Sequence, residues 1–177
     1  MQHFIGIVPP EEYVERIVAF QKRWPSSRLP QLVEPHITVK AQSGLTEDRQ
    51  WLERVRKIGA EFPGFSLSLG ESKWFARAVL YLDVRSKELH ALHAQLVQAV
   101  SPTEKQMVRY SELDRFLPHL TLGQTYWGLS EAELAEMEEG VAEALAPYPS
   151  FRVTRFRIYQ EITTNRYVPL EDVELGG

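Results

Sequence analysis

The chain has 177 residues, of which 44% are hydrophobic and 25% charged, a composition typical of a globular domain with one well-buried core. Its formal net charge of −4 argues against a protein that holds long nucleic acid by phosphate attraction, but it leaves a short anionic ligand open. The absence of cysteine excludes disulfides and thiolate catalysis. With no secretory signal and no apolar run that could span a membrane, we expect a cytoplasmic monomer without a membrane partner.

The first half of the chain alternates between strand and helix patterns. A helical stripe follows the first strand, and Thr46 is the expected N-cap of a second helix with acidic residues in its first turn. In chain order we expect a strand at 3–8, a helix at 11–24, a strand at 35–40, a helix at 45–62 and a strand at 65–75.

The second half runs through the same order. Ser86 and Ser130 are the expected N-caps of its two helices, the latter forming a capping box with Glu133. The expected elements are a strand at 78–84, a helix at 87–100, a loop at 101–117, a strand at 118–123, a helix at 130–145 and strands at 151–160 and 166–173.

The two halves are similar in sequence as well as in order. "PHITV" at 35–39 matches "PHLTL" at 118–122, and "GLTE" at 44–47 matches "GLSE" at 128–131. We interpret this as the duplication of one unit, with halves at about 1–77 and 78–177 in a single bilobal domain, 1–177. The expected class is α+β: two pseudo-symmetric lobes, each a mainly antiparallel sheet with helices on its outer face, and a central cleft. The C-terminal strand could complete the other lobe.

Each repeated motif carries a histidine and a threonine two residues apart. Residues i and i+2 of a strand share a face, so His36 lies with Thr38 and His119 with Thr121, while the apolar residues between them face the helices. The pseudo-symmetry predicts that the two polar faces meet in the cleft.

This set of four side chains suits phosphodiester chemistry. One imidazole can take a proton from the attacking oxygen while the other protonates the leaving oxygen. The threonine hydroxyls can donate hydrogen bonds to the phosphate oxygens, and the scheme requires neither a metal nor another cofactor. A lone histidine in a strand is more simply a packed core residue. A chance second match to this motif is rarer than ~1 in 100, which favours the functional interpretation.

The paired H-x-T motifs, one in each half of a duplicated α+β unit, resemble the two-histidine phosphoesterase superfamily, and within it the 2′-5′ RNA ligase-like proteins. The resemblance implies a bilobal fold and action on 2′,3′-cyclic phosphate or 2′-5′ phosphodiester bonds of RNA termini or small nucleotides, with reversible ligation as an option. It also implies that His36, Thr38, His119 and Thr121 are catalytic, with His119 as base and His36 as acid. The sequence alone does not order these roles, and it leaves the substrate open.

Four further residues are candidates for substrate binding. Lys40 continues the face of His36 and Thr38, where it could attract phosphate or lie at a solvated strand end. Tyr126 and Trp127 follow the second motif and could stack on a base. Arg77 belongs to a basic and aromatic segment near the junction of the halves, for which core aromatics beside surface charges are the simpler explanation.

Other features have simpler structural explanations. Arg155 and Arg157 share a strand face that is either solvated or part of a phosphate site. His90 and His93 have zinc-ligand spacing, but His93 falls in an apolar helical stripe, so we expect packing and no metal site. The loop at 101–117 directly precedes His119 and is a candidate lid or rim of the cleft. The alternatives to a metal-independent enzyme are a non-catalytic nucleotide- or RNA-end-binding module and a metal-dependent hydrolase.

Overall fold

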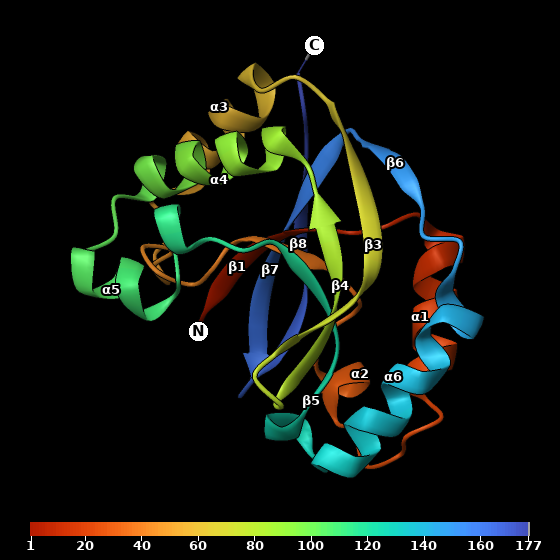
Figure 1. Cartoon of the computed structure of the whole chain (residues 1–177). Helices are drawn as coiled ribbons and strands as arrows, with labels where there is room; N and C mark the ends of the chain where they lie inside the picture. Colours follow the sequence, from red (N-terminus) through yellow and green to blue (C-terminus); the bar gives the residue numbers. More distant parts are fainter. Residues whose placement is uncertain (177) are drawn as a thin grey trace.

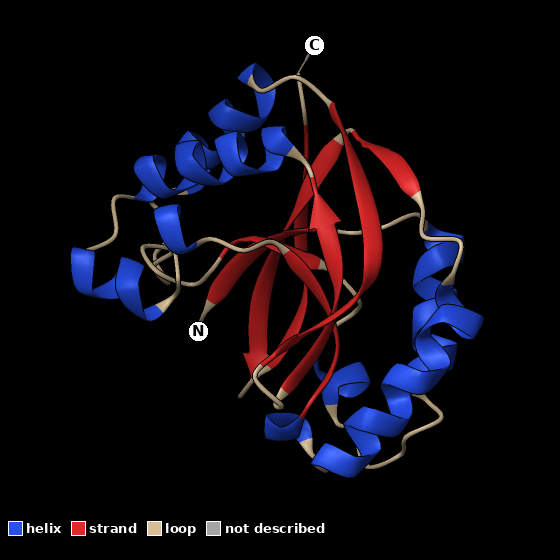
Figure 2. Ribbon diagram, viewed as in Figure 1, coloured by secondary structure: helices blue, strands red, loops and turns tan. Residues whose placement is uncertain are grey.

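The computed structural model describes residues 1–176, and its centre is a single antiparallel sheet of eight strands with helices on either side (Figures 1 and 2). The elements are β1 (His3–Ile7), α1 (Glu11–Gln21), α2 (Leu29–Leu32), β2 (Ile37–Lys40), α3 (Leu52–Glu61), β3 (Phe65–Phe75), β4 (Val79–Arg85), α4 (Lys87–Val100), α5 (Glu104–Arg109), η1 (Leu113–Arg115), β5 (His119–Gln124), η2 (Thr125–Trp127), α6 (Glu131–Leu145), β6 (Ser150–Val153), β7 (Arg155–Thr163) and β8 (Arg166–Glu174). Among residues 1–176, no helix is both long enough and apolar enough to cross a membrane.

The sheet consists of two arms that meet at its middle. The strand order is β6-β3-β4-β5-β2-β1-β7-β8, so the first arm contains β2, β1, β7 and β8, and the second contains β5, β4, β3 and β6. The arms are joined by the antiparallel pairing of β2 with β5, where Ile37 lies opposite Leu120. The expected α+β class with antiparallel strands and two lobes is confirmed, and the two lobes share one continuous sheet.

The helices cover the arms in pairs. Figure 1 shows α3 beside α4 on one side of the sheet and α1 beside α6 on the other. The α3–α4 pair contacts β8 and β2, and α4 also reaches β3, whereas the α1–α6 pair contacts β5, β3 and β4. Each arm is thus packed by one helix from either half of the chain, and the fully buried residues of the pattern, such as Ile17 and Leu92, form the core between them.

Most expected elements are present; the differences concern the start of α3, the strand expected at 151–160 and the loop expected at 101–117. Ser86 and Ser130 cap α4 and α6 as expected, since each hydroxyl accepts a hydrogen bond from the third residue of its helix. Thr46 does not cap α3, because Arg49 has a left-handed backbone (φ 56°) and the helix begins only at Leu52.

The segment expected as one strand at 151–160 is two strands. The first, β6, pairs with β3 in the second arm, and the second, β7, pairs with β1 and β8 in the first arm. The segment expected as a loop at 101–117 contains α5, with a capping box of Thr103 and Gln106, and the short η1 helix. We call residues 101–117 the rim segment.

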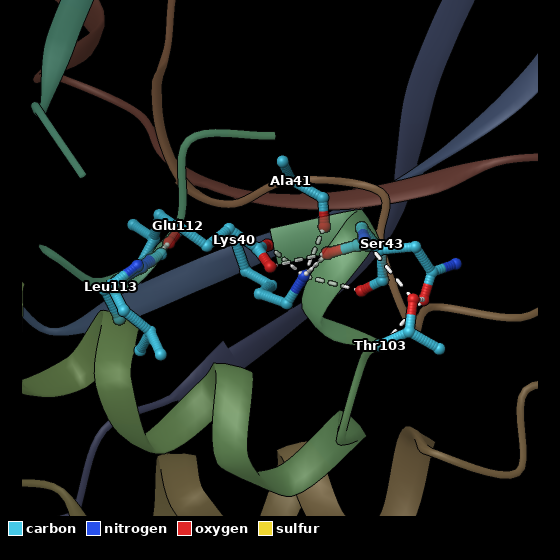
Figure 3. Close-up of polar contacts among 9 residues, drawn as sticks. Lys40, Ala41, Ser43, Thr103, Glu112 and Leu113 are labelled. Carbon is cyan, nitrogen blue, oxygen red and sulfur yellow. Dashed lines mark hydrogen bonds and ion pairs between the residues drawn. The ribbon is translucent and has the colours of Figure 1, made fainter. Parts of the chain in front are cut away.

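A buried ion pair fastens the rim segment to the end of β2. Figure 3 shows Lys40 surrounded by oxygen atoms: its Nζ lies 2.5 Å from Glu112 Oε1, 2.6 Å from the Ser43 carbonyl and 2.8 Å from both Ser43 Oγ and the Ala41 carbonyl. Both charged side chains are at most 1% exposed. Burial lowers the pKa of Lys40, and the hydrogen bond that its ammonium donates to Glu112 opposes this shift.

His93 makes a second connection beside this ion pair. Its Nδ1 donates to the Val39 carbonyl at 2.6 Å, and its Nε2 accepts from the Leu113 backbone N–H at 2.9 Å. The ring also stacks on Phe116, with centroids 3.8 Å apart. Both ring nitrogens are therefore engaged in holding α4, β2 and the rim segment together.

We expect Glu112→Ala to destabilise the protein by about 3–5 kcal/mol, because it leaves the Lys40 ammonium buried without a counter-charge. Urea denaturation followed by circular dichroism measures the change. The matched control is Glu61→Ala, which removes an exposed ion pair with Lys57 and should cost less than about 1 kcal/mol. The double variant Lys40→Met/Glu112→Leu should recover most of the loss. A double variant no more stable than Glu112→Ala would contradict the assignment to an unpaired charge.

Candidate functional site

The two H-x-T motifs lie on the strands that join the arms. His36 directly precedes β2 and His119 opens β5. The apolar residues of the motifs, among them Ile37 and Leu120, are fully buried, whereas the histidines and threonines are half-buried on the opposite face. The side-chain alternation expected for these strands is therefore observed.

The pairing of β2 with β5 brings the four polar side chains together. Because Ile37 lies opposite Leu120 in an antiparallel pair, His36 falls opposite Thr121 and Thr38 falls opposite His119. Side chains opposite one another in such a pair are about 4.5–5.5 Å apart at Cβ. Each histidine thus has the threonine of the other motif as its cross-strand neighbour.

Two adjoining cavities open on this face. The first, of about 230 Å³, is lined by His36, Thr38 and Thr121, and the second, of about 280 Å³, by Thr38 and His119. They share Thr38, which therefore separates the cavity of His36 from that of His119. Each alone is somewhat smaller than the usual small-molecule site of about 300–1,000 Å³, which they reach only together.

Both imidazoles are held in the same way. His36 Nδ1 lies 2.8 Å from the Glu34 carbonyl, and His119 Nδ1 lies 2.8 Å from the Leu117 carbonyl. A carbonyl oxygen can only accept, so Nδ1 carries the proton in both rings and Nε2 is left to face a ligand. The accepting residue precedes a proline in both motifs, and this restricts it to extended backbone.

Each imidazole also lies against a stacked pair of aromatic rings. His36 contacts Phe4 and Tyr159, whose centroids are 4.5 Å apart, and His119 contacts Phe75 and Tyr81, at 4.2 Å. These rings come from outside the motifs, on β1 and β7 for one histidine and on β3 and β4 for the other. Sequence reasoning missed them as supports of the histidines, because only the tertiary pairing of the strands brings them to the motifs.

Burial dominates the electrostatics of both histidines. It lowers the pKa of His36 from its usual value of 6.5; the hydrogen bond to Glu34 opposes the shift, and the charge of nearby His119 adds to it. Burial likewise lowers the pKa of His119, and the hydrogen bond to Leu117 opposes this shift. Neutral imidazole is therefore favoured at both positions above pH 6.5.

A polar cluster behind His36 fixes the residue that holds its ring. Arg157 Nη1 and the Tyr159 hydroxyl donate to Glu34 Oε1 at 2.8 and 2.7 Å, and Arg157 also makes a two-pronged contact with Asp172. Arg157 is therefore occupied by two carboxylates rather than facing the histidines. A larger cavity of about 470 Å³ borders this cluster, but none of the four motif residues lines it and both of its arginines are paired with carboxylates, so we place the chemistry in the two cavities above.

Lys40, a candidate for phosphate attraction, does not reach the cleft. It lies on the same face of β2 as Thr38, but the rim segment covers it and its ammonium has the four oxygen partners shown in Figure 3. The prediction that Lys40 contacts the substrate phosphate is therefore wrong. Alternation identifies the face of a strand but gives no information on a distant segment that covers it.

The other three binding candidates occupy different places. Trp127 is half-buried and lines the His36 cavity, whereas Tyr126 beside it is 72% exposed. Arg77 is exposed and borders a separate cavity with Trp74 and Glu131, and none of the four motif residues lines that cavity. Of these three residues, the structure therefore brings only Trp127 to a cavity lined by a motif histidine, that of His36.

Comparisons with known proteins agree with the paired motifs. The family model of the 2′-5′ RNA ligase superfamily matches residues 9–165. E. coli LigT in complex with NADP⁺ superimposes with a TM-score of 0.64 at 21% sequence identity, covering 99% of this chain and 98% of that chain. For TT0787 of Thermus thermophilus the TM-score is 0.69 at 19% identity, covering 100% of this chain and 99% of that chain. Among curated proteins, none matches the chain in sequence.

The structural neighbours have below 25% identity and show that the fold is shared. The family model spans most of the chain, including both H-x-T motifs. The chain therefore belongs to the 2′-5′ RNA ligase superfamily of two-histidine phosphoesterases.

Proposed function

We propose that the protein is a metal-independent phosphoesterase that cleaves 2′,3′-cyclic phosphate or 2′-5′ phosphodiester bonds of RNA ends or small nucleotides. The observation that supports this most directly is the cross-strand arrangement of two imidazoles, each held through Nδ1 and each facing the threonine of the other motif. The superfamily is enzymatic, and structures of E. coli LigT in complex with 3′-AMP, ATP and NADP⁺ are in keeping with a nucleotide ligand.

The proposed reaction needs one imidazole in each protonation state. Nε2 of the neutral ring, assigned to His119 by family resemblance, removes a proton from water as its oxygen attacks phosphorus. Nε2–H of the other ring, His36, protonates the ribose oxygen as its bond to phosphorus breaks. Thr38 and Thr121 donate hydrogen bonds to the non-bridging oxygens, where negative charge accumulates. In ligation a 5′-hydroxyl replaces water: one histidine removes its proton as the oxygen attacks the 2′,3′-cyclic phosphate, and the other protonates the 3′ oxygen as its bond to phosphorus breaks. The two histidines exchange roles when the 3′-hydroxyl attacks the 2′-5′ bond and expels the 5′ oxygen.

We expect His36→Ala and His119→Ala each to lower kcat/KM for nucleoside 2′,3′-cyclic phosphates by about 10²-fold or more, the usual contribution of a positioned acid or base. Initial rates with chromatographic identification of the products measure this. Gln95→Ala, on the exposed side of α4, is the control and should retain full activity. A double His36→Ala/His119→Ala variant with normal turnover would end the proposal.

The same assay separates the alternatives. Activity should survive chelation with EDTA, because the two histidines and two threonines supply every proton transfer and hydrogen bond in the scheme. Loss of activity on chelation would indicate a metal-dependent hydrolase instead. Nucleotide binding without turnover at any pH from 5 to 8 would indicate a non-catalytic binding module, and either result contradicts the proposal.

The pH dependence of kcat/KM should be bell-shaped, with its maximum below about pH 6.5. The pKa values of both histidines lie below 6.5, so the state with one neutral and one protonated ring is most populated on the acid side of that value. Activity falls at lower pH as the base becomes protonated, and at higher pH as the acid loses its proton. A maximum above pH 8 would exclude this pair as the acid and base.

A further inference from the structure

The cavity beside His36 extends into a pocket of side-chain amides. Beyond His36, Thr38 and Thr121, its lining contains four carboxamides, those of Gln2, Gln42, Gln124 and Asn165. Within residues 1–176, no aspartate, glutamate, lysine or arginine belongs to this lining. The pocket is therefore neutral and polar, which suits a group that forms directional hydrogen bonds better than it suits a second phosphate.

Tyr167 orients two of these amides. Its hydroxyl donates to Gln2 Oε1 at 2.9 Å and accepts from Gln42 Nε2 at 3.3 Å. These bonds leave the amide N–H groups of Gln2 and the carbonyl oxygen of Gln42 for a ligand, which provides a donor and an acceptor on one side of the pocket. Nucleobase edges carry the same combination of adjacent donors and acceptors, and asparagine and glutamine are their usual partners.

Aromatic and apolar side chains form the rest of the pocket wall. Trp127 is held in place by Arg28, whose guanidinium lies 5.7 Å from the ring centroid and whose backbone N–H donates to the Trp127 carbonyl at 2.8 Å. Phe4 contacts both Tyr167 and His36, with centroid distances of 4.9 Å. A flat ring entering the pocket would thus meet aromatic surface as well as amides, the combination on which bases stack and are read.

The cavity beside His119 has a different lining, although the two motifs are pseudo-symmetric. Its side chains include Phe75, Tyr110, Phe116 and Arg115, and among the described residues no asparagine or glutamine contributes to it. The two sides of the phosphate site therefore differ in chemistry, so a substrate with one base has a preferred orientation.

We propose that the amide-lined pocket binds the nucleobase of the nucleotide whose phosphate lies between His36 and His119. The substrates are then nucleoside phosphodiesters with the base close to the reacting phosphate, rather than base-free phosphodiesters. This inference rests on the proposed function only for the position of the phosphate.

Equilibrium binding tests the pocket without turnover. Isothermal titration with adenosine, guanosine, cytidine and uridine 2′-monophosphates should give affinities at least about 10-fold higher than inorganic phosphate for one or more bases. Gln42→Ala, and Tyr167→Phe, which keeps the ring but releases both glutamines, should each reduce that preference by about 5-fold or more without changing phosphate affinity. Gln95→Ala, the same substitution on the exposed side of α4, is the control and should change neither value.

Equal affinities for nucleotides and phosphate in the wild-type protein would overturn the inference, as would no nucleotide binding in the millimolar range or a full preference retained in Gln42→Ala and Tyr167→Phe. These results are distinct from a failure of the proposed function. If the histidine variants remain active but the base preference follows Gln42 and Tyr167, the pocket stands and the acid–base assignment fails. If the histidines are essential but base and phosphate bind alike, only the pocket fails.

Discussion

The site depends on the antiparallel pairing of β2 with β5 at the centre of the sheet. A single residue pair, Ile37 and Leu120, fixes the register, and both side chains are completely buried beneath helices. Side chains alternate along a strand, so a slip of one residue would send the histidines into the core and the apolar residues into the cleft. The hydrophobic cost of that slip fixes the position of the polar groups, and the chemistry depends on the packing of residues that never touch a ligand.

The local sequence predicts those helix ends and strand faces that are determined by interactions between residues close together in the chain. The caps at Ser86 and Ser130 and the alternation around His36 and His119 depend on neighbours within a few residues, and the structure has them all. The expected cap at Thr46 failed because the left-handed backbone at Arg49 interrupts the turn before the helix. The division of residues 150–163 into β6 and β7 follows from partners on opposite arms of the sheet, which no local pattern encodes.

The candidate site shows the same division between local and distant information. The repeated motif alone predicts four candidate catalytic residues, and the pairing of β2 with β5 brings those four to one face of the sheet. The supports of the histidines, such as Tyr159 behind His36, come from strands far away in the chain. Lys40 alternates onto the same strand face as His36 and Thr38, which line the cleft. The rim segment nevertheless covers Lys40 and supplies Glu112 as its ion-pair partner. The alternation of side chains is fixed within one strand, whereas the solvent exposure of a side chain depends on every segment that packs against that strand.

The crossed packing of the helices bears on how such a chain could arise. The first half supplies β1, β2 and β3, yet β3 belongs to the second arm, and α1 packs beside α6 of the second half. A free copy of one half would expose the β2 edge that here meets β5, and such an edge invites pairing with another chain. Two copies could close that edge around a two-fold axis, with each subunit contributing one histidine and one threonine to a shared centre. In such an ancestor neither subunit would hold a complete site, so joining the copies in one chain would make the chemistry independent of protein concentration.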